Sequence, residues 1–379
     1  MKSKTIYFVA GEVSADNHGA ELMRSLRQMD STLRFVGRGG PQMREIAGEQ
    51  LKNWIGDAGV LGLWEVIRKY NYFREQFRET LNEIEERKPD AVVLIDYPGF
   101  NLRLASALRK QSPQGKIIYY ISPQVWAWNR GRIKKMARLV DLVLCIFPFE
   151  ADLYNESGLR AVFVGHPMIE RSNAQKIDTE RDSNLVGLFP GSRSREVQKI
   201  VPVVLEATNL LRQQKPGLHF EVAAASSALA AEINKLLDRY SRDRQVLAVK
   251  VGETAAIMQR AFAGIVASGS ATLEAAYFRM PFVLIYKVAW PTYLAARLVV
   301  SVKYLGMPNV LANKEVVPEF IQQAARPAAI VKAVRPLMEN ADVRQRMISE
   351  FDQLIGQLGK GNASDKAARA IIDEIETLT

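Results

Sequence analysis

Several residue types and patterns are scarce or absent in this chain of 379 residues, and each absence excludes a class of protein. Cys145 is the only cysteine, so neither an intrachain disulfide nor a metal centre built from several cysteines can form. No apolar run approaches the roughly 20 uninterrupted residues of a membrane-spanning helix. Lys2 and Lys4 precede a short apolar stretch that Glu12 and Asp16 end at once, which indicates a first β-strand and not a signal peptide. We therefore expect a protein of a reducing compartment that does not cross a membrane.

Three common nucleotide-binding signatures are missing as well. The chain has no GxxxxGK[ST] phosphate loop, no GxGxxG fingerprint in its first strand-to-helix turn, and no DxD pair to hold a divalent ion on a sugar nucleotide. We therefore expect neither a metal nor an organic cofactor, with phosphate charge met by helix N-termini and arginine. Histidine is also scarce, and we interpret His18 and His166 as structural or substrate-orienting residues and not as catalysts.

Acidic residues are absent from two long stretches, and this distribution says more than the formal net charge of +10. Residues 97–140 contain no Asp or Glu but nine Lys and Arg side chains, and residues 275–314 are also free of acids. Such segregation favours an anionic partner, namely phosphate groups, acidic lipid or nucleic acid. An ordinary solvated basic surface is the alternative.

Short β-branched runs alternate with helical patterns, which is typical of parallel α/β sheets. We predict helices over 20–28, 64–86 and 102–110. The predicted strands of the first half are 5–10, 33–36, 91–96, 117–121, 139–146 and 161–164. Those of the second half are 185–189, 220–224, 246–249, 264–267 and 282–286.

The fold class that follows is α/β, with two tandem Rossmann-like domains. We expect an N-terminal domain over 1–170, a polar linker over 171–184 and a C-terminal domain over 185–345. Residues 346–379 read as charged helices, and the pattern leaves open whether they pack back on the first domain.

Polar residues that directly follow predicted strands are the first candidates for a site, because ligands of parallel sheets bind beyond the carboxyl ends of strands. Glu12 lies in the turn after the first strand, in the run 11–16. Asp96 ends a fully apolar strand and Pro98 turns the chain into a helix. A partly desolvated carboxylate at this place can act as a general base. A turn or helix-capping aspartate is the alternative.

Two strand-to-helix turns of the second half are candidates for phosphate binding. In the first, Gly191 permits close backbone approach and Arg193 can pair with a phosphate. In the second, the small residues 268–272 offer N–H groups, and Glu274 could accept ribose hydroxyls. Either turn alone is more often plain helix capping, but two at equivalent strand ends favour nucleotide binding.

An excess of apolar residues lies between 60 and 67, followed by aromatic and basic side chains. The number of apolar residues is larger than one buried helix face needs, which indicates an interfacial helix. Core packing plus a dimer contact is the alternative. A similar mixture recurs at 290–303. The predicted membrane residues are Val60, Leu61, Leu63, Trp64, Val66 and Ile67.

The motifs resemble those of the lipid-A-disaccharide synthases in the same order along about four fifths of the chain. The matching runs are residues 11–16, 95–101, 122–128, 190–193 with Glu196, 267–274 and 307–309. The run Ser-Pro-Gln-Val-Trp-Ala-Trp at 122–128 is the most specific. One departure is Ala15, where the family usually has glycine, so assignments around Glu12 rest on less than those around Asp96.

The resemblance implies a glycosyltransferase B fold and a specific inverting reaction. Donor UDP-2,3-diacylglucosamine and acceptor 2,3-diacylglucosamine 1-phosphate (lipid X) would give the β-1,6-linked disaccharide 1-phosphate and UDP. Asp96 would be the base, assisted by Glu12. The residues implied for UDP are Gly191, Ser192, Arg193, Ser268, Gly269, Ser270, Ala271, Thr272, Glu274 and Asn309, and those for the acceptor are Ser14, Asn101, Ser122, Trp126 and Trp128.

The same resemblance implies a cytoplasmic protein held peripherally at the inner membrane, without nucleic acid as a partner, and leaves a homodimer open. Three rival functions follow from the residues. The first is another enzyme of this fold acting on UDP-N-acetylglucosamine, such as a wall-synthesis transferase or a 2-epimerase. The second is a non-enzymatic nucleotide-binding regulator. The third, a nucleic-acid binder, ranks last because no recognition helix or recurring aromatic platform is present.

Overall fold

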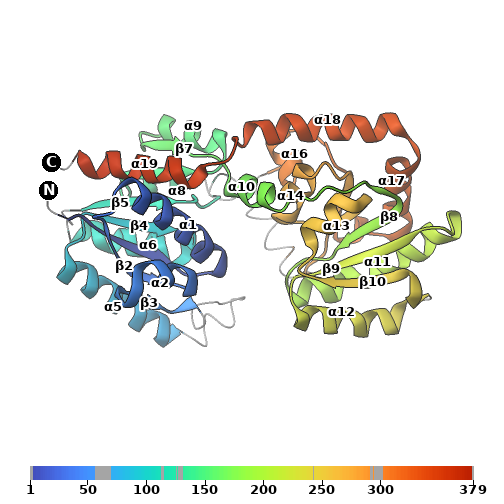
Figure 1. Cartoon of the computed structure of the whole chain (residues 1–379), viewed down its shortest axis with the longest axis horizontal. Coiled ribbons are helices and arrows are strands. Elements are labelled where there is room, and N and C mark those ends of the chain that lie inside the picture. The colour runs from blue at the N-terminus through green and yellow to red at the C-terminus, as the bar shows by residue number, and fades with distance from the viewer. Residues whose placement is uncertain are drawn as a thin grey trace. The chain divides into compact units, whose positions relative to one another are not determined.

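The chain divides into two compact units, which we describe separately. In the computed structural model the described residues are 3–55, 70–111, 115–124, 126, 131–241, 243–290, 293 and 302–377. Unit 1 comprises Met1–Pro167 and Leu358–Thr379, and unit 2 comprises Met168–Gln357. The last helix, α19 (Ala363–Glu376), therefore belongs with the N-terminal half of the chain, whereas α18 (Ala341–Gln357) belongs to unit 2 (Figure 1).

Unit 1 is built on a parallel seven-stranded sheet with the order β3-β2-β1-β4-β5-β6-β7. The central strands β1 and β4 are almost fully buried, as expected of a parallel sheet covered on both faces. The strands are β1 (Thr5–Ala10), β2 (Arg34–Gly39), β3 (Leu51–Asn53), β4 (Ala91–Ile95), β5 (Lys116–Tyr120), β6 (Leu142–Cys145) and β7 (Ala161–Phe163).

Two layers of helices cover this sheet. Alternate residues of β1 point to opposite faces, so Ile6 and Phe8 pack in one core cluster while Tyr7 and Val9 pack in the other. The first cluster includes α1 (Val13–Met29), α2 (Pro41–Ala47) and α19, and the second includes α5 (Tyr70–Arg87), α6 (Pro98–Lys110), α8 (Gly131–Met136) and α9 (Pro148–Glu156).

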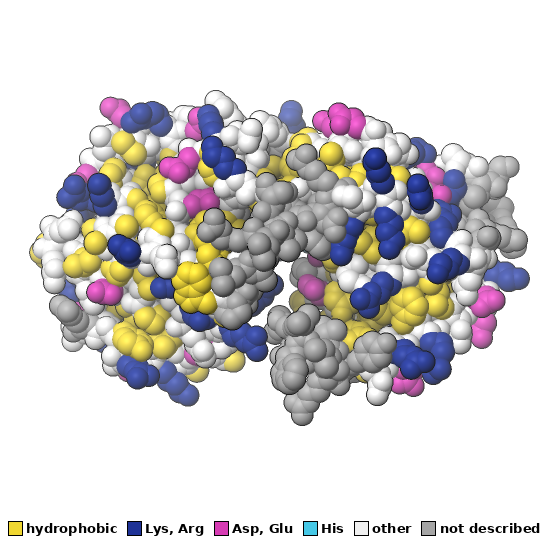
Figure 2. All heavy atoms as spheres, turned by 180° about the vertical axis from the view of Figure 1, so that it is seen from behind, with side chains coloured by type: hydrophobic (Ala, Val, Ile, Leu, Met, Phe, Trp, Pro, Cys, Tyr) yellow, Lys and Arg dark blue, Asp and Glu magenta, His cyan; other side chains and the backbone are white. Residues whose placement is uncertain are grey.

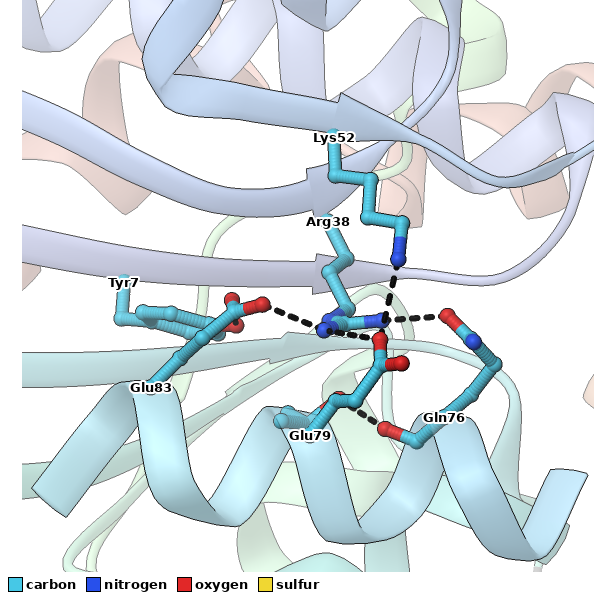
Figure 3. A network of polar contacts seen from close by, with 7 residues as sticks. Tyr7, Arg38, Lys52, Gln76, Glu79 and Glu83 are labelled. Carbon is cyan, nitrogen blue, oxygen red and sulfur yellow. Dashed lines mark hydrogen bonds and ion pairs between the residues drawn. The ribbon is translucent and has the colours of Figure 1, made fainter.

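A buried polar network fastens α5 to the sheet (Figure 3). Arg38 of β2 is fully buried, and its guanidinium donates to Gln76, Glu79 and Glu83 of α5. Tyr7 of β1 also donates to Glu83, at 2.6 Å. An arginine without exposed surface requires such partners, because an unpaired buried charge is costly. The network therefore fixes the position of the helix that follows residues 56–69.

Unit 2 repeats the architecture with a parallel six-stranded sheet of order β10-β9-β8-β11-β12-β13, and helices lie on both faces (Figure 1). Its strands are β8 (Asp182–Phe189), β9 (His219–Ala224), β10 (Leu247–Val251), β11 (Ala261–Ala267), β12 (Phe282–Tyr286) and β13 (Glu319–Ile321). Its helices are α10 (Pro167–Ala174), α11 (Ser194–Gln214), α12 (Ser227–Tyr240), α13 (Thr254–Arg260), α14 (Ala271–Tyr277), α16 (Met307–Ala312), α17 (Pro327–Glu339) and α18.

The predicted α/β fold with two parallel sheets is confirmed, with local differences. The strand predicted to end at Asp96 ends at Ile95, because Asp96 has a left-handed backbone. Sequence patterns missed β3 and β13, each only three residues long. The segment predicted as a linker, 171–184, contains the end of α10 and the start of β8.

Candidate functional site

The strand order places two polar turns of unit 1 side by side. Chain connections run in opposite directions from β1 and β4, so the sheet has its topological switch point between them, where ligands of open α/β sheets bind. The register pairs Ala10 with Ile95. Gly11 and Asp96 therefore leave neighbouring strands at the same level, and Glu12 follows Gly11 as the N-cap residue of α1.

Asp96 lies in a strained turn that several side chains hold in place. Asp96 and Tyr97 both have a φ of 47°, a left-handed conformation that costs non-glycine residues roughly 1–3 kcal/mol each. The Asp96 carbonyl accepts hydrogen bonds from Asn101 Nδ2 at 2.8 Å and from the Tyr119 hydroxyl. The rings of Tyr97 and Phe100 pack edge-on against Trp54. Strain maintained by this many contacts is typical of a functional turn.

The carboxyl group of Asp96 binds a proton more tightly in this turn than an aspartate does in water. Burial, together with the negative charge of Glu12, raises the pKa of Asp96 from 3.8 to about 6. The same two causes raise the pKa of the Tyr97 hydroxyl to about 12. A carboxylate with a pKa near neutrality can accept a proton from an alcohol in a reacting complex, which is the requirement for a general base.

The second carboxylate of the first turn, Asp16, has a structural role. Its side chain is buried and accepts three backbone N–H groups, from Gly40 at 2.8 Å and from Gln42 and Met43 at 3.0 Å. These bonds cap α2 at its N-terminus. Glu12, by contrast, is exposed, so of the two acids only Glu12 is available at the surface. Ala15 is fully buried within α1 and packs in the core.

A pocket of about 350 Å³ lies beyond the ends of β4, β5 and β6. Asp96, Ser122 and Glu150 line it from these three neighbouring strand ends, together with Pro98 and Phe147. Sequence reasoning overlooked Glu150. The side chain is fully buried, and burial raises the pKa of Glu150 to about 7 even though hydrogen bonds, chiefly from Trp126, lower it. The pocket thus holds two carboxyl groups whose pKa values lie near neutrality.

The remaining residues predicted to contact the acceptor occupy different positions. Ser14 is exposed on α1, and Ser122 lines the pocket. Asn101 is fully buried, and its amide donates to the Ile95 and Asp96 carbonyls, so it supports the turn and does not line the pocket. Trp126 is buried, and its indole N–H donates to Glu150 Oε1 at 2.9 Å. Trp128 lies outside the described residues.

Unit 2 has its own switch point, between β8 and β11, and both predicted phosphate-binding turns lie there. The register pairs Phe189 with Val266, so the turns at 190–193 and 268–270 leave the sheet together. Gly191 has a φ of 105° and Gly269 a φ of 147°, conformations that favour glycine. Ser192, Arg193, Gly269 and Ser270 are exposed, and Ser268 and Ala271 are half-buried. The N-terminus of α11, a helix of 21 residues, follows Arg193.

Several residues predicted to bind UDP are engaged within unit 2. Arg193 pairs with Glu196 at 3.1 Å. Burial raises the pKa of Tyr286 at the end of β12; the charge of Glu196 adds to this rise, and that of Arg193 opposes it. Glu274 pairs with Arg171 at 2.6 Å. Thr272 is fully buried, and its hydroxyl donates to the Gly269 carbonyl.

Asn309 is predicted to contact the nucleotide, and in the structure its side-chain amide hydrogen-bonds to groups of the protein itself. The residue is fully buried, and its Oδ1 accepts from Val316 and Val317 while its Nδ2 donates to the Val317 carbonyl and Glu319. Glu319, which sequence reasoning missed, also accepts the Gly306 N–H at 2.8 Å. Asn309 therefore orders the start of α16 and the approach to β13.

The predicted membrane residues Val60, Leu61, Leu63, Trp64, Val66 and Ile67 lie outside the described residues. Within the described ranges, no helix combines the length and apolar character needed to cross a bilayer. In the second aromatic and basic mixture, Trp290 is 50% exposed and its ring meets that of Tyr293 edge-on, with centroids 5.7 Å apart.

Solved structures share this arrangement of two sheets. MnaA of S. aureus with UDP has a TM-score of 0.64 at 14% identity and covers 99% of this chain and 98% of its own. The UDP-GlcNAc 2-epimerase of Neisseria meningitidis bound to UDP-GlcNAc has a TM-score of 0.61 at 13% identity, and the match covers 98% of this chain and 100% of the epimerase chain. The calicheamicin glycosyltransferase CalG4 has a TM-score of 0.59 at 14% identity (100% of both). The fold is that of the glycosyltransferase B class.

Sequence comparison identifies the family within this class. Residues 6–372 match the family described as Lipid-A-disaccharide synthetase. The lipid-A-disaccharide synthase of Trichlorobacter lovleyi is 36% identical over 99% of this chain and 98% of its own length. That of Coxiella burnetii is 35% identical over 98% of each. The chain belongs to the lipid-A-disaccharide synthase family, and it is a glycosyltransferase that forms the lipid A disaccharide.

Proposed function

We propose that the protein transfers 2,3-diacylglucosamine from UDP-2,3-diacylglucosamine to the 6-hydroxyl of 2,3-diacylglucosamine 1-phosphate. The products would be the β-1,6-linked disaccharide 1-phosphate and UDP. The observation that carries this proposal is the placement of Asp96, which leaves the sheet next to the switch point, lines the pocket beyond β4, β5 and β6, and has a carboxyl pKa raised to about 6. Family membership supports the choice of substrates.

In the proposed reaction Asp96 acts as the general base. Its carboxylate accepts the proton of the acceptor 6-hydroxyl while the oxygen forms a bond to the anomeric carbon of the donor. The bond between that carbon and the diphosphate breaks in the same step, and UDP departs with the electron pair. A single displacement inverts the anomeric centre, so an α-linked donor gives a β-linked product. Glu12 contributes its charge, which raises the proton affinity of Asp96.

We place UDP on the two turns of unit 2. The guanidinium of Arg193 and the backbone N–H groups around Gly191, Ser192 and residues 268–270 would meet the diphosphate charge, aided by the dipole of α11. Glu274 would accept ribose hydroxyls after exchange of its contact with Arg171. Thr272 and Asn309 would support UDP binding without contacting the nucleotide, because their side chains hydrogen-bond to the local backbone.

The proposal also includes a metal-independent reaction at a membrane surface. Leaving-group charge would be neutralised by arginine and helix N-termini. Donor and acceptor each carry two acyl chains and would therefore lie in the membrane, so the protein must bind at the membrane surface. We assign this docking, on the cytoplasmic face of the inner membrane, to residues 60–67.

The test is transfer between the two purified lipids in detergent micelles containing EDTA, with product linkage and anomeric configuration assigned by NMR. A β-1,6 disaccharide 1-phosphate and stoichiometric UDP are expected. Absence of disaccharide from well-folded protein would overturn the proposal, and epimerised UDP-N-acetylglucosamine in a parallel reaction would replace it with a 2-epimerase. An α-linked product would overturn the inverting mechanism alone.

A further inference from the structure

A basic groove on unit 1 lies beside the pocket of Asp96 but is distinct from it. The groove has a volume of about 320 Å³ and runs between α6 and α8. Three cationic side chains line it, namely Arg103 of α6 with Arg132 and Lys135 of α8, and no acidic residue does. Leu102, Met136 and Leu139 form its apolar wall. On the face in Figure 2, Lys and Arg side chains of unit 1, on the right, surround hydrophobic side chains.

The cations of the groove differ from a neighbouring arginine that has a structural role. Arg109, also on α6, pairs with Asp141 at 2.6 Å and donates to the Leu139 carbonyl at 3.1 Å. Arg103 and Lys135 are exposed, and neither makes an ion pair with any residue in the described part of the chain. Two unpaired cations on facing helices, in a segment free of acids, form a local site of positive potential suited to a dianion.

The groove and the Asp96 pocket share a wall. Pro98 lines both, and Gly99 continues the groove side, so one turn of chain separates them. In a hexopyranose 1-phosphate, the carbon that bears the phosphate (C1) and the carbon that bears the 6-hydroxymethyl group (C5) both flank the ring oxygen, so the phosphate and the 6-hydroxyl project from neighbouring positions into adjoining sites. An acceptor that crosses the turn at Pro98 can place its hydroxyl at Asp96 and its phosphate between α6 and α8.

We propose that Arg103, Arg132 and Lys135 bind the anomeric phosphate monoester of the acceptor and make the enzyme selective for phosphorylated acceptors. This inference rests on the proposed function, since it concerns the acceptor of that reaction. The apolar wall formed by Leu102, Met136 and Leu139 would contact the first carbons of an acyl chain next to the phosphate. The groove thereby orients the sugar so that its free primary hydroxyl, and not the phosphate end, meets the base.

The test compares Arg103→Gln, Lys135→Gln and the double variant with Lys134→Gln, a matched control. Lys134 is the preceding residue of α8, is exposed, and does not line the groove. The substrates are 2,3-diacylglucosamine 1-phosphate and the same lipid without phosphate, both in neutral detergent micelles. Acceptor KM, kcat and donor KM are measured, and binding of each lipid is measured by calorimetry without donor.

Each groove variant is expected to raise the KM and the Kd of the phosphorylated acceptor roughly tenfold, the order of one charge-assisted hydrogen bond. The donor KM and the kcat should stay within about twofold, since the lost contact stabilises bound substrate and transition state equally. The preference for the phosphorylated lipid should collapse in the double variant, and Lys134→Gln should match wild type.

Unchanged preference in the double variant, with disaccharide still formed by wild type, would overturn the phosphate site and leave the proposed function intact. No disaccharide from wild type, with phosphate-dependent lipid binding lost in the variants, would support the site and overturn the function. A further arm uses vesicles with phosphatidylglycerol. Loss of vesicle binding in the variants with unchanged acceptor binding would make the groove a phospholipid headgroup site and overturn the inference.

Discussion

The ring of Tyr97 lies directly on the backbone of Gly11. A Cβ atom built on Gly11 would lie 2.4 Å from Cδ1 of Tyr97 and 2.7 Å from Cε1, far inside van der Waals contact. Gly11 precedes Glu12, and Tyr97 follows Asp96. Because the two loops meet at this contact, the absence of a side chain at Gly11 sets how closely the two carboxyl groups approach one another.

Gly11→Ala should therefore lower kcat by roughly tenfold to a hundredfold, since displacement of a catalytic group by about 1 Å has effects of this order. The alanine forces Tyr97 and the Asp96 turn away while α1 and the core remain. Steady-state kinetics and a thermal melt check this. Gly356→Ala is the control, because a Cβ atom at that position in α18 meets open space. Wild-type kcat in Gly11→Ala would show that the contact does not position the base.

Activity should rise with pH through about 6 as Asp96 loses its proton, because only the carboxylate can accept a proton from the acceptor. Glu12→Gln removes a negative charge that raises the pKa of Asp96, so the acid limb of kcat/KM should move to lower pH.

The measurement is a pH profile of kcat/KM for both proteins, with Glu156→Gln at the exposed end of α9 as control. A limb that stays in place in Glu12→Gln would contradict the electrostatic coupling of the two carboxyl groups.

Glu150 should make the protein less stable as the pH rises. Burial raises its pKa from 4.5 to about 7, so between these values the folded state holds a proton that the unfolded state has released. The slope of unfolding free energy against pH from this group is therefore negative in that window. Its stabilising contribution is complete below about 4.5 and is lost through about 7.

Glu150→Gln removes this titration while its amide oxygen can still accept the Trp126 N–H. Urea unfolding at pH 4.5 and at pH 7.5 should show the variant gaining stability relative to wild type at the higher pH. An equal difference at both values would mean that Glu150 does not carry the raised pKa.

Arg193→Gln should weaken UDP binding roughly tenfold, the loss of a charge-assisted contact to phosphate. Calorimetry with UDP and no metal measures this. Arg195→Gln is the control, because Arg195 is an exposed neighbour at the start of α11 with no ion pair to any described residue. Equal UDP affinity in wild type and Arg193→Gln would place the diphosphate elsewhere.

Parts of this site were predictable from the sequence because strand ends carry their own signal. Asp96 was found because a buried apolar run ends at it, and Arg193 because a glycine precedes it and a helix starts directly after it. Short strands such as β3 and β13 carry too few residues for a periodic pattern. The return of α19 to unit 1 depends on a long-range contact with α1 that amphipathic periodicity alone cannot assign to a partner.

Side-chain direction was the part that the sequence could not supply. Asn101 and Asn309 lie in the expected motifs, yet both amides turn inward to backbone groups, because a buried turn needs its own polar groups paired. Glu150 was overlooked because a charged residue in the first turn of a helix is usually solvated. The structure shows that it is fully buried and accepts the indole N–H of Trp126.

The most direct test of the central claim is the single-turnover rate of disaccharide formation in Asp96→Asn. Asparagine tolerates the left-handed backbone of this position, so the turn should persist. We expect a loss of roughly 10²–10⁴-fold, the usual range for a general base, with UDP affinity and thermal stability unchanged. Asp152→Asn, at an exposed position of α9, should behave as wild type. Disaccharide formed by Asp96→Asn at the wild-type rate would contradict the account.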